Sequence, residues 1–122
     1  PDMLSLGKQI QIACDSAKFG VARLAGGEAP KFDDTESTIA ELQTRIEATA
    51  AYLRSVPADQ VDGSEGKPIS VPVRGRDPLQ FTGEQYLKHF ALPNFFFHVT
   101  TAYALLRHNG VELGKADYLR GG

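Results

Sequence analysis

Residues 86–110 read YLKHFALPNFFFHVTTAYALLRHNG, and the rest of the chain is expected to pack around them. It is the longest apolar run compatible with a helix, and it holds all three histidines of the chain. Some of its residues recur at intervals of three and four, as on one face of an α-helix: Phe90, Asn94, His98, Thr101 and Leu105. A buried polar atom without a partner costs about 1–3 kcal/mol, so Asn94 and His98 must be hydrogen-bonded, ligate an ion or face a cavity. We therefore expect a central helix here, with the functional site at these two residues.

The ends of this helix carry residues that typically start and stop helices. Thr82 and Gln85 have the spacing of a capping box, and Asn109-Gly110 is a typical stop. A proline inside a helix removes one backbone hydrogen bond, so we expect a kink around residues 89–93. The tail beyond the stop is expected to be short and irregular, with these anchors: Leu113, Tyr118 and Leu119.

Composition and charge exclude several classes of protein. A chain of 122 residues with 42% hydrophobic residues is expected to form one domain, residues 1–122, around a single core. The net charge of −2 gives no reason to expect nucleic acid as a partner, and no apolar run is long enough to cross a membrane. We expect a cytoplasmic protein. The single cysteine, Cys14, is expected to be a small buried hydrophobic residue.

Upstream, we expect a helix over about residues 2–25, entered at Pro1-Asp2 and closed by Gly26-Gly27. Its apolar stripe is Leu6, Ile10, Ala13, Ala17, Val21 and Leu24. Ile12 and Phe19 point away from this stripe, which is typical of a helix with two neighbours.

A loop over residues 28–37 separates the first helix from a second, which has Thr38 as its N-cap and ends before Pro57. On the outer face of this second helix, Glu41 and Arg45 are expected to form an exposed i,i+4 pair. The period then changes to two over residues 63–82, which predicts a small β-hairpin that must lie on the helices to be stable.

The string HFALPNFFFHVTTAYALLRHNGVELGKADYLRG, residues 89–121, closely resembles the C-terminal signature of an uncharacterised bacterial family of domains of unknown function. That family is grouped with the DinB/YfiT-like metalloenzyme superfamily. The resemblance implies an all-α four-helix bundle, of which this chain supplies three long helices and a small β-hairpin before the last. The missing element would be the first helix, so the resemblance also implies an N-terminal truncation.

In that superfamily, a divalent metal is held by one histidine of the second helix and an H-x-x-x-H pair of the fourth, and some members catalyse thiol-dependent transfer. The resemblance places His98 on the second histidine of the pair and Asn94 on the first. The remaining ligand would fall near Gln11 or Ile12, where no histidine stands, so the triad is incomplete. Asparagine, glutamine and aspartate offer zinc or nickel mostly weak oxygen ligands. We therefore expect no cofactor, with Zn or Ni at His98 as the alternative.

Two classes of function stay open. The first is a diverged enzyme or small-molecule binder, with His98 as base or residual metal ligand, Asn94 orienting it, and Gln11 or Asp15 lining the opposite wall. A metal- or thiol-dependent transferase or hydrolase is the sharper form of this class. The second is a non-catalytic helical interaction module whose polar pair only fixes packing.

A missing helix also predicts an open groove. We expect that groove to expose Ile12 and Phe19 of the first helix, because a bundle of three helices leaves one apolar face uncovered. Either a helix absent from this sequence or a second copy of the chain would cover it, and we expect a homodimer besides.

Overall fold

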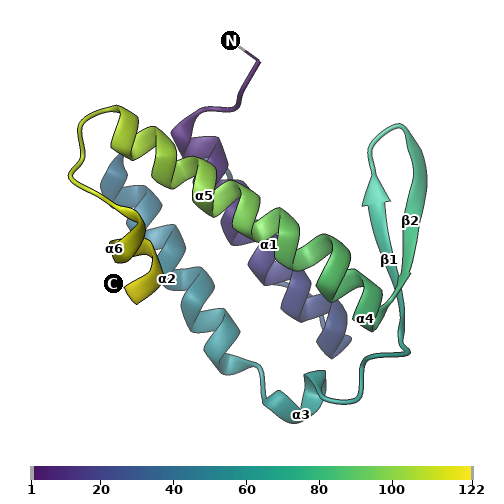
Figure 1. Cartoon of the computed structure of the whole chain (residues 1–122). Helices are drawn as coiled ribbons and strands as arrows, with labels where there is room; N and C mark the ends of the chain where they lie inside the picture. Colours follow the sequence, from purple (N-terminus) through teal and green to yellow (C-terminus); the bar gives the residue numbers. More distant parts are fainter. Residues whose placement is uncertain (1, 122) are drawn as a thin grey trace.

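The computed structural model describes residues 2–121 and is mostly helical, with one two-stranded antiparallel sheet (Figure 1). The elements in chain order are α1 (Leu6–Ala25), α2 (Ile39–Ser55), α3 (Ala58–Val61), β1 (Pro68–Val73), β2 (Arg76–Thr82), α4 (Gly83–Tyr86), the π-helical turn η1 (Leu87–Ala91), α5 (Leu92–His108) and α6 (Lys115–Arg120). No helix among these residues is both long and apolar enough to cross a membrane.

Helix α1 begins four residues later than expected. Its N-cap is Ser5, whose hydroxyl accepts from the backbone N–H of Lys8, so the helix entry predicted at Asp2 is wrong and Pro1 lies outside the described residues. The predicted stop is confirmed. Gly26 has φ 75°, a left-handed conformation that favours glycine, and its N–H and that of Gly27 bond the last carbonyls of the helix.

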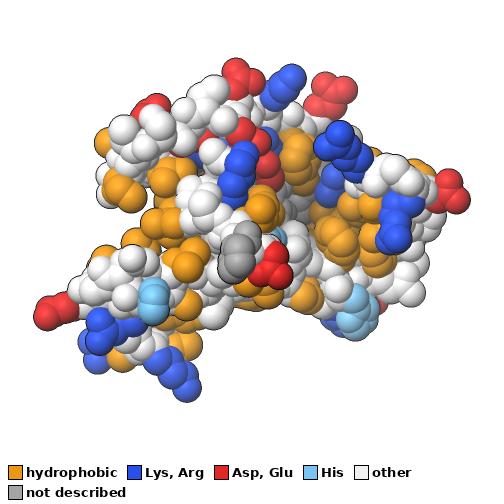
Figure 2. Space-filling view, turned by 90° about the horizontal axis from the view of Figure 1, so that it is seen from above, with side chains coloured by type: hydrophobic (Ala, Val, Ile, Leu, Met, Phe, Trp, Pro, Cys, Tyr) orange, Lys and Arg blue, Asp and Glu red, His pale blue; other side chains and the backbone are white. Residues whose placement is uncertain are grey.

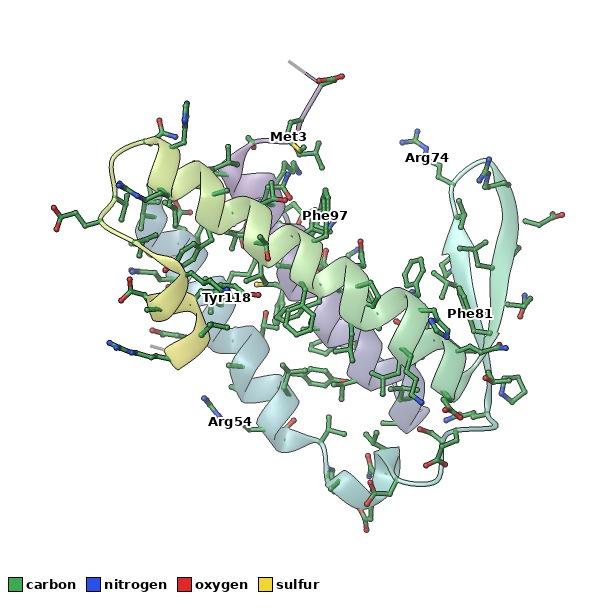
Figure 3. All side chains as sticks on the ribbon, viewed as in Figure 1. Met3, Arg54, Arg74, Phe81, Phe97 and Tyr118 are labelled. Carbon is green, nitrogen blue, oxygen red and sulfur yellow. The ribbon has the colours of Figure 1, made fainter. Side chains whose placement is uncertain are left out.

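The second helix and the hairpin follow the prediction. The Thr38 hydroxyl accepts from the N–H of Glu41 at 3.1 Å, and α2 ends before Pro57. Strands β1 and β2 pair antiparallel, with Ile69 opposite Phe81. The inner face of β1 packs on the helices, in a cluster formed by Leu24, Ile69, Val71, Tyr86 and Ala91. In Figure 3 the labelled Phe81 lies at the base of the hairpin, while Arg74 lies at its exposed tip.

The central helix starts and stops where expected. Thr82 and Gln85 form a reciprocal capping box, and α5 ends at His108, just before Asn109 and Gly110. Ahead of Pro93 the chain makes one π-helical turn, in which the Leu92 N–H bonds the carbonyl of Leu87, five residues back. A proline cannot continue the four-residue ladder, and the wider turn accommodates that break.

The tail differs from the prediction, because residues 115–120 form the short helix α6. The N–H of Gly114 donates to the Asp117 carboxylate, which starts the helix. Tyr118 is an anchor, with its ring against that of Tyr103 at 5.5 Å, and Figure 3 shows it pointing from α6 toward the long helices. Leu119 is not an anchor, since it is 69% exposed.

Helix α1 lies at the centre of the arrangement. It packs against α5 on one side and α2 on the other, whereas α2 and α5 barely contact each other (Figure 1). At Gly20 of α1, the last residue of η1 comes close enough that an added Cβ would lie 3.7 Å from the Cβ of Ala91. The three long helices thus form an open trough with α1 as its floor.

Candidate functional site

His98 meets Gln9 of α1, with Nδ1 and Oε1 only 2.6 Å apart. Gln9 is fully buried, and its Nε2 donates to the carbonyl of Leu4 at 3.3 Å and to the sulfur of Met3 at 3.4 Å. These acceptors fix the amide orientation, so Oε1 is the atom that faces the histidine. His98 must then carry its proton on Nδ1, which leaves Nε2 with a free lone pair in the neutral ring.

The charge of His98 follows from its surroundings. Burial lowers the pKa of His98 below the ordinary value of 6.5, because a charged imidazolium loses hydration there. The ring of Phe97 packs edge-on against it at 5.1 Å between centroids. Near pH 7 the side chain is therefore a neutral imidazole in one tautomer, which is a proton acceptor rather than a cation.

Asn94 also faces α1, one turn before His98. Its Nδ2 donates to the hydroxyl of Ser16 at 2.9 Å, and that hydroxyl donates to the carbonyl of Ile12 at 2.7 Å. Both polar residues of the central helix are thus hydrogen-bonded, as the sequence required, but their partners are Gln9 and Ser16. The sequence pattern did not point to either partner. Gln9 lies four residues before Ala13 and Ser16 three residues after it, so the helical spacing was the one signal that could have found them.

Gln11 and Asp15 were expected on the wall opposite His98, and Gln11 does not lie there. Its Nε2 donates to Glu36 at 3.0 Å on the α2 side of α1. Asp15 lies between the two contacts: its Oδ1 pairs with Arg45 at 2.9 Å, and it shares a small hollow with Asn94. Gln11 points away from α5 because residues i and i+2 lie on opposite sides of a helix, and Gln9 already faces α5.

Arg45 is the centre of the α2 side, and the expectation of an exposed pair with Glu41 is wrong. Its side chain is 2% exposed and bonds Asp34 at 2.6 Å and Glu36 at 3.2 Å, in addition to Asp15. The loop over residues 28–37 supplies the two new carboxylates. A buried guanidinium needs such partners, and the helical spacing within α2 could not reveal them.

The electrostatics of this cluster are coupled. Burial alone would raise the pKa of Glu36, but hydrogen bonds from its backbone, Gln11 and Arg45 outweigh it, and the pKa lies below 4.5. Burial acts to lower the pKa of Arg45, but its carboxylate partners outweigh burial, so the pKa is raised above its ordinary value. The cluster is an ionic clamp between α1, α2 and the loop.

The residues around His98 do not fit a zinc or nickel site. Within the described part of the chain, no group of three His, Cys, Asp or Glu side chains is placed to hold a metal ion. The groups beside His98 are the neutral amides of Gln9 and Asn94 and the hydroxyl of Ser16, which are weak ligands for these metals.

A larger apolar groove of about 390 Å³ opens between α1, α2 and α5. Its lining includes Ile10, Ala13, Cys14, Ala17, Ile46, Leu53, Phe95 and Val99. On the face shown in Figure 2, hydrophobic side chains lie in hollowed regions between lobes edged by charged ones. Burial raises the pKa of Cys14, which stays a thiol, as expected. The open groove therefore lies on the main stripe of α1, and not over Ile12 and Phe19 as predicted.

Ile12 and Phe19 instead line the small hollow that holds Asn94 and Asp15. Phe19 is 38% exposed, and two cationic groups lie over its ring, that of Lys18 at 4.7 Å from the ring centroid and that of Arg23 at 5.0 Å.

These features define a small, mostly helical protein with a polar contact between its first and last long helices. The chain belongs to the DUF1993 family, a domain of unknown function, which matches residues 1–119. A solved structure described as a DinB family member protein from Shewanella denitrificans is 45% identical, with a TM-score of 0.85. The match covers 97% of this chain and 66% of that one. No curated protein matches. The prediction of an uncharacterised, DinB-like family is thus confirmed.

Proposed function

We propose that the protein is a DinB-like helical protein with a degenerate metal site, which works without a bound divalent metal. The observation that carries this proposal is the Gln9–His98 pair. Oε1 of Gln9 is the hydrogen-bond partner of Nδ1 of the histidine, and Nε2 of Gln9 donates to the carbonyl of Leu4. A divalent metal would find one imidazole nitrogen at most and otherwise neutral amide and hydroxyl oxygens.

The same pair supports a chemical role for His98. A neutral imidazole with its tautomer fixed by a hydrogen bond can accept a proton at Nε2, which is the role of a general base. The Asn94 amide, held by Ser16, would orient a small polar ligand at the same helix face. We assign His98 the proton-accepting role and Asn94 the positioning role.

Elemental analysis of protein purified without an affinity tag tests the metal-free claim. The expected result is well below one equivalent of zinc, nickel or iron, with no gain on incubation with Zn²⁺ followed by desalting. A matched sample of His98→Gln should give the same result. Near-stoichiometric metal in the parent that is lost in His98→Gln would overturn the proposal and favour the metal-dependent transferase or hydrolase.

The apolar groove favours a second candidate, the helical interaction module. We propose that α1, α2 and α5 are three helices of a four-helix bundle and that a helix outside these 122 residues covers the groove. The support is the apolar lining, together with the greater length of the similar DinB family structure, of which the match covers 66%. A homodimer in the cytoplasm, with each copy covering the other, is the expected state when that helix is absent.

Binding of the dye ANS and sedimentation measure this exposure. The chain should bind ANS and associate, and Val99→Glu, which puts a charge in the groove, should reduce both. Thr100→Glu on the adjacent exposed position serves as the control. Equal dye binding and association in parent and Val99→Glu would refute the uncovered groove.

A further inference from the structure

A small hollow beside the α1–α5 contact has no part in the metal-free proposal. Its volume is about 190 Å³. The lining residues are Ile12, Asp15, Ser16, Phe19 and Arg23 from α1, with Tyr86, Phe90, Ala91 and Asn94 from the facing segment. His98 does not line it, and Asn94 is the residue that the hollow shares with the site proposed at His98. Polar groups converge on it from two ends, as in small-molecule sites.

One end of the hollow presents a cation. The guanidinium of Arg23 packs on the rings of Phe19, at 5.0 Å, and Tyr86, at 5.8 Å. One nitrogen donates to the Tyr86 hydroxyl at 3.1 Å. Among the described residues, no carboxylate forms an ion pair with Arg23. An arginine has five N–H groups, so this one is held in place with donors to spare for a carboxylate.

The other end presents acceptors. Both ion pairs of Asp15, with Arg45 and Lys18, end on Oδ1 and leave Oδ2 out, and Asp15 is one of the residues that line the hollow. Asn94 uses its Nδ2 on Ser16, and its amide oxygen has no partner in the described part of the chain. A ligand must therefore bring hydrogen-bond donors here, and an ammonium group supplies three of them.

We infer that the hollow binds a short zwitterion, an aliphatic carboxylate with an amino group at the far end of its chain. The carboxylate pairs with Arg23, and the ammonium donates to Asp15 and Asn94. The methylenes lie against the rings of Phe19 and Phe90. Asp15 and Arg23 are eight residues apart, about 12 Å along the helix. Both line the same hollow of about 190 Å³, whose size limits the ligand to a few methylenes.

Titration with 5-aminovalerate, followed by calorimetry or by NMR shifts of Asn94 and Arg23, tests this inference. Saturable binding is expected. Valerate and pentylamine each lack one charge, so their affinity should be lower by at least about tenfold. Arg23→Gln should weaken 5-aminovalerate to the same degree, whereas Arg54→Gln, on the exposed face of α2, should not change it.

Three results would overturn the inference: no binding of 5-aminovalerate at about 10 mM, equal binding of valerate, or full binding by Arg23→Gln. Circular dichroism checks that the variant is folded, and the valerate and pentylamine comparison needs only the parent protein. Metal analysis of the same samples is unaffected by any of these outcomes, so failure of zwitterion binding leaves the metal-free proposal standing.

Discussion

Helix α1 meets its two neighbours in different ways. Toward α5 and the preceding turn η1 it presents neutral groups and a glycine: Gln9, Ser16 and Gly20. Toward α2 it presents the polar side chains that join the ionic clamp of Arg45: Gln11, Asp15 and Lys18. The groove-lining residues, including Ile10, Ala13 and Ala17, lie on a third face. One helix thus keeps a directional, uncharged contact on the side where the candidate site lies and a charged one on the side that holds the loop.

Mutation of the ionic clamp should destabilise the protein more than mutation of the neutral α1–α5 contact. Arg45→Met keeps an apolar stem but leaves Asp34 and Glu36 without their cation, and Asp15 keeps only Lys18. Removing one partner of a buried ion pair costs about 3–5 kcal/mol, and the partial exposure of Asp34 places the expected cost toward the lower end. We expect a larger fall in Tm than any substitution in the Gln9–His98 pair produces. Arg54→Met, on the exposed surface of α2 (Figure 3), should change Tm little. A similar small change in Arg45→Met would show that the clamp does not hold α2.

The neutral contact should respond less strongly. Gln9→Leu leaves His98 Nδ1 and the Leu4 carbonyl unpaired, which costs about 1–3 kcal/mol. Chemical denaturation of Gln9→Leu and His98→Ala measures this, with exposed His108→Ala as the control. Unfolding curves of Gln9→Leu that coincide with the parent's would mean that the pair is not formed.

The two contacts should also weaken in different ranges of pH. The pKa of His98 in the folded chain lies below 6.5, so the unfolded chain takes up a proton first as the pH falls and stability drops below about pH 6.5. The pKa of Glu36 is lowered from 4.5, so its contribution is present above that pH and is lost as the pH falls through the lower folded value. Stability curves should show the first step disappear in His98→Gln and the second in Glu36→Gln. If the same fall in stability disappeared in both variants, the two contacts would not titrate separately.

The smallest expected effect is at the contact between Gly20 of α1 and the π-helical turn η1. In Gly20→Ala the new methyl meets Ala91 at 3.7 Å, an ordinary contact, and alanine favours a helix over glycine by roughly 1 kcal/mol. A slight rise in Tm is expected. Gly83→Ala is the matched opposite, because its methyl would clash with the backbone of Ser64. A loss of stability in Gly20→Ala would mean that the helices are closer than described.

Much of the fold was predictable because its signals are local. The caps at Thr38 and Thr82, the stop at Gly26 and the alternation in β1 each act over a few residues, and each is confirmed. Helix α6 was not predicted because it is a single short helix, started by Gly114 and Asp117, and has no apolar stripe.

Only the residues that α5 contributes to the site could be predicted from the sequence. The spacing of Asn94 and His98 showed that both are on the inner face, and buried polar atoms require partners. Which residues supply them depends on how α1 is rotated against α5, which the pattern within one helix does not determine. The same holds for Arg45, whose acidic partners Asp34 and Glu36 come from the loop over residues 28–37.

The central claim, that Gln9 rather than a metal holds His98, is tested most directly by the ¹⁵N and ¹H NMR spectrum of the imidazole ring near pH 7, recorded with and without one equivalent of Zn²⁺. We predict a ring protonated on Nδ1 and unprotonated on Nε2, with signals unchanged by zinc. A ring protonated on Nε2, or signals that shift with stoichiometric zinc, would contradict the account.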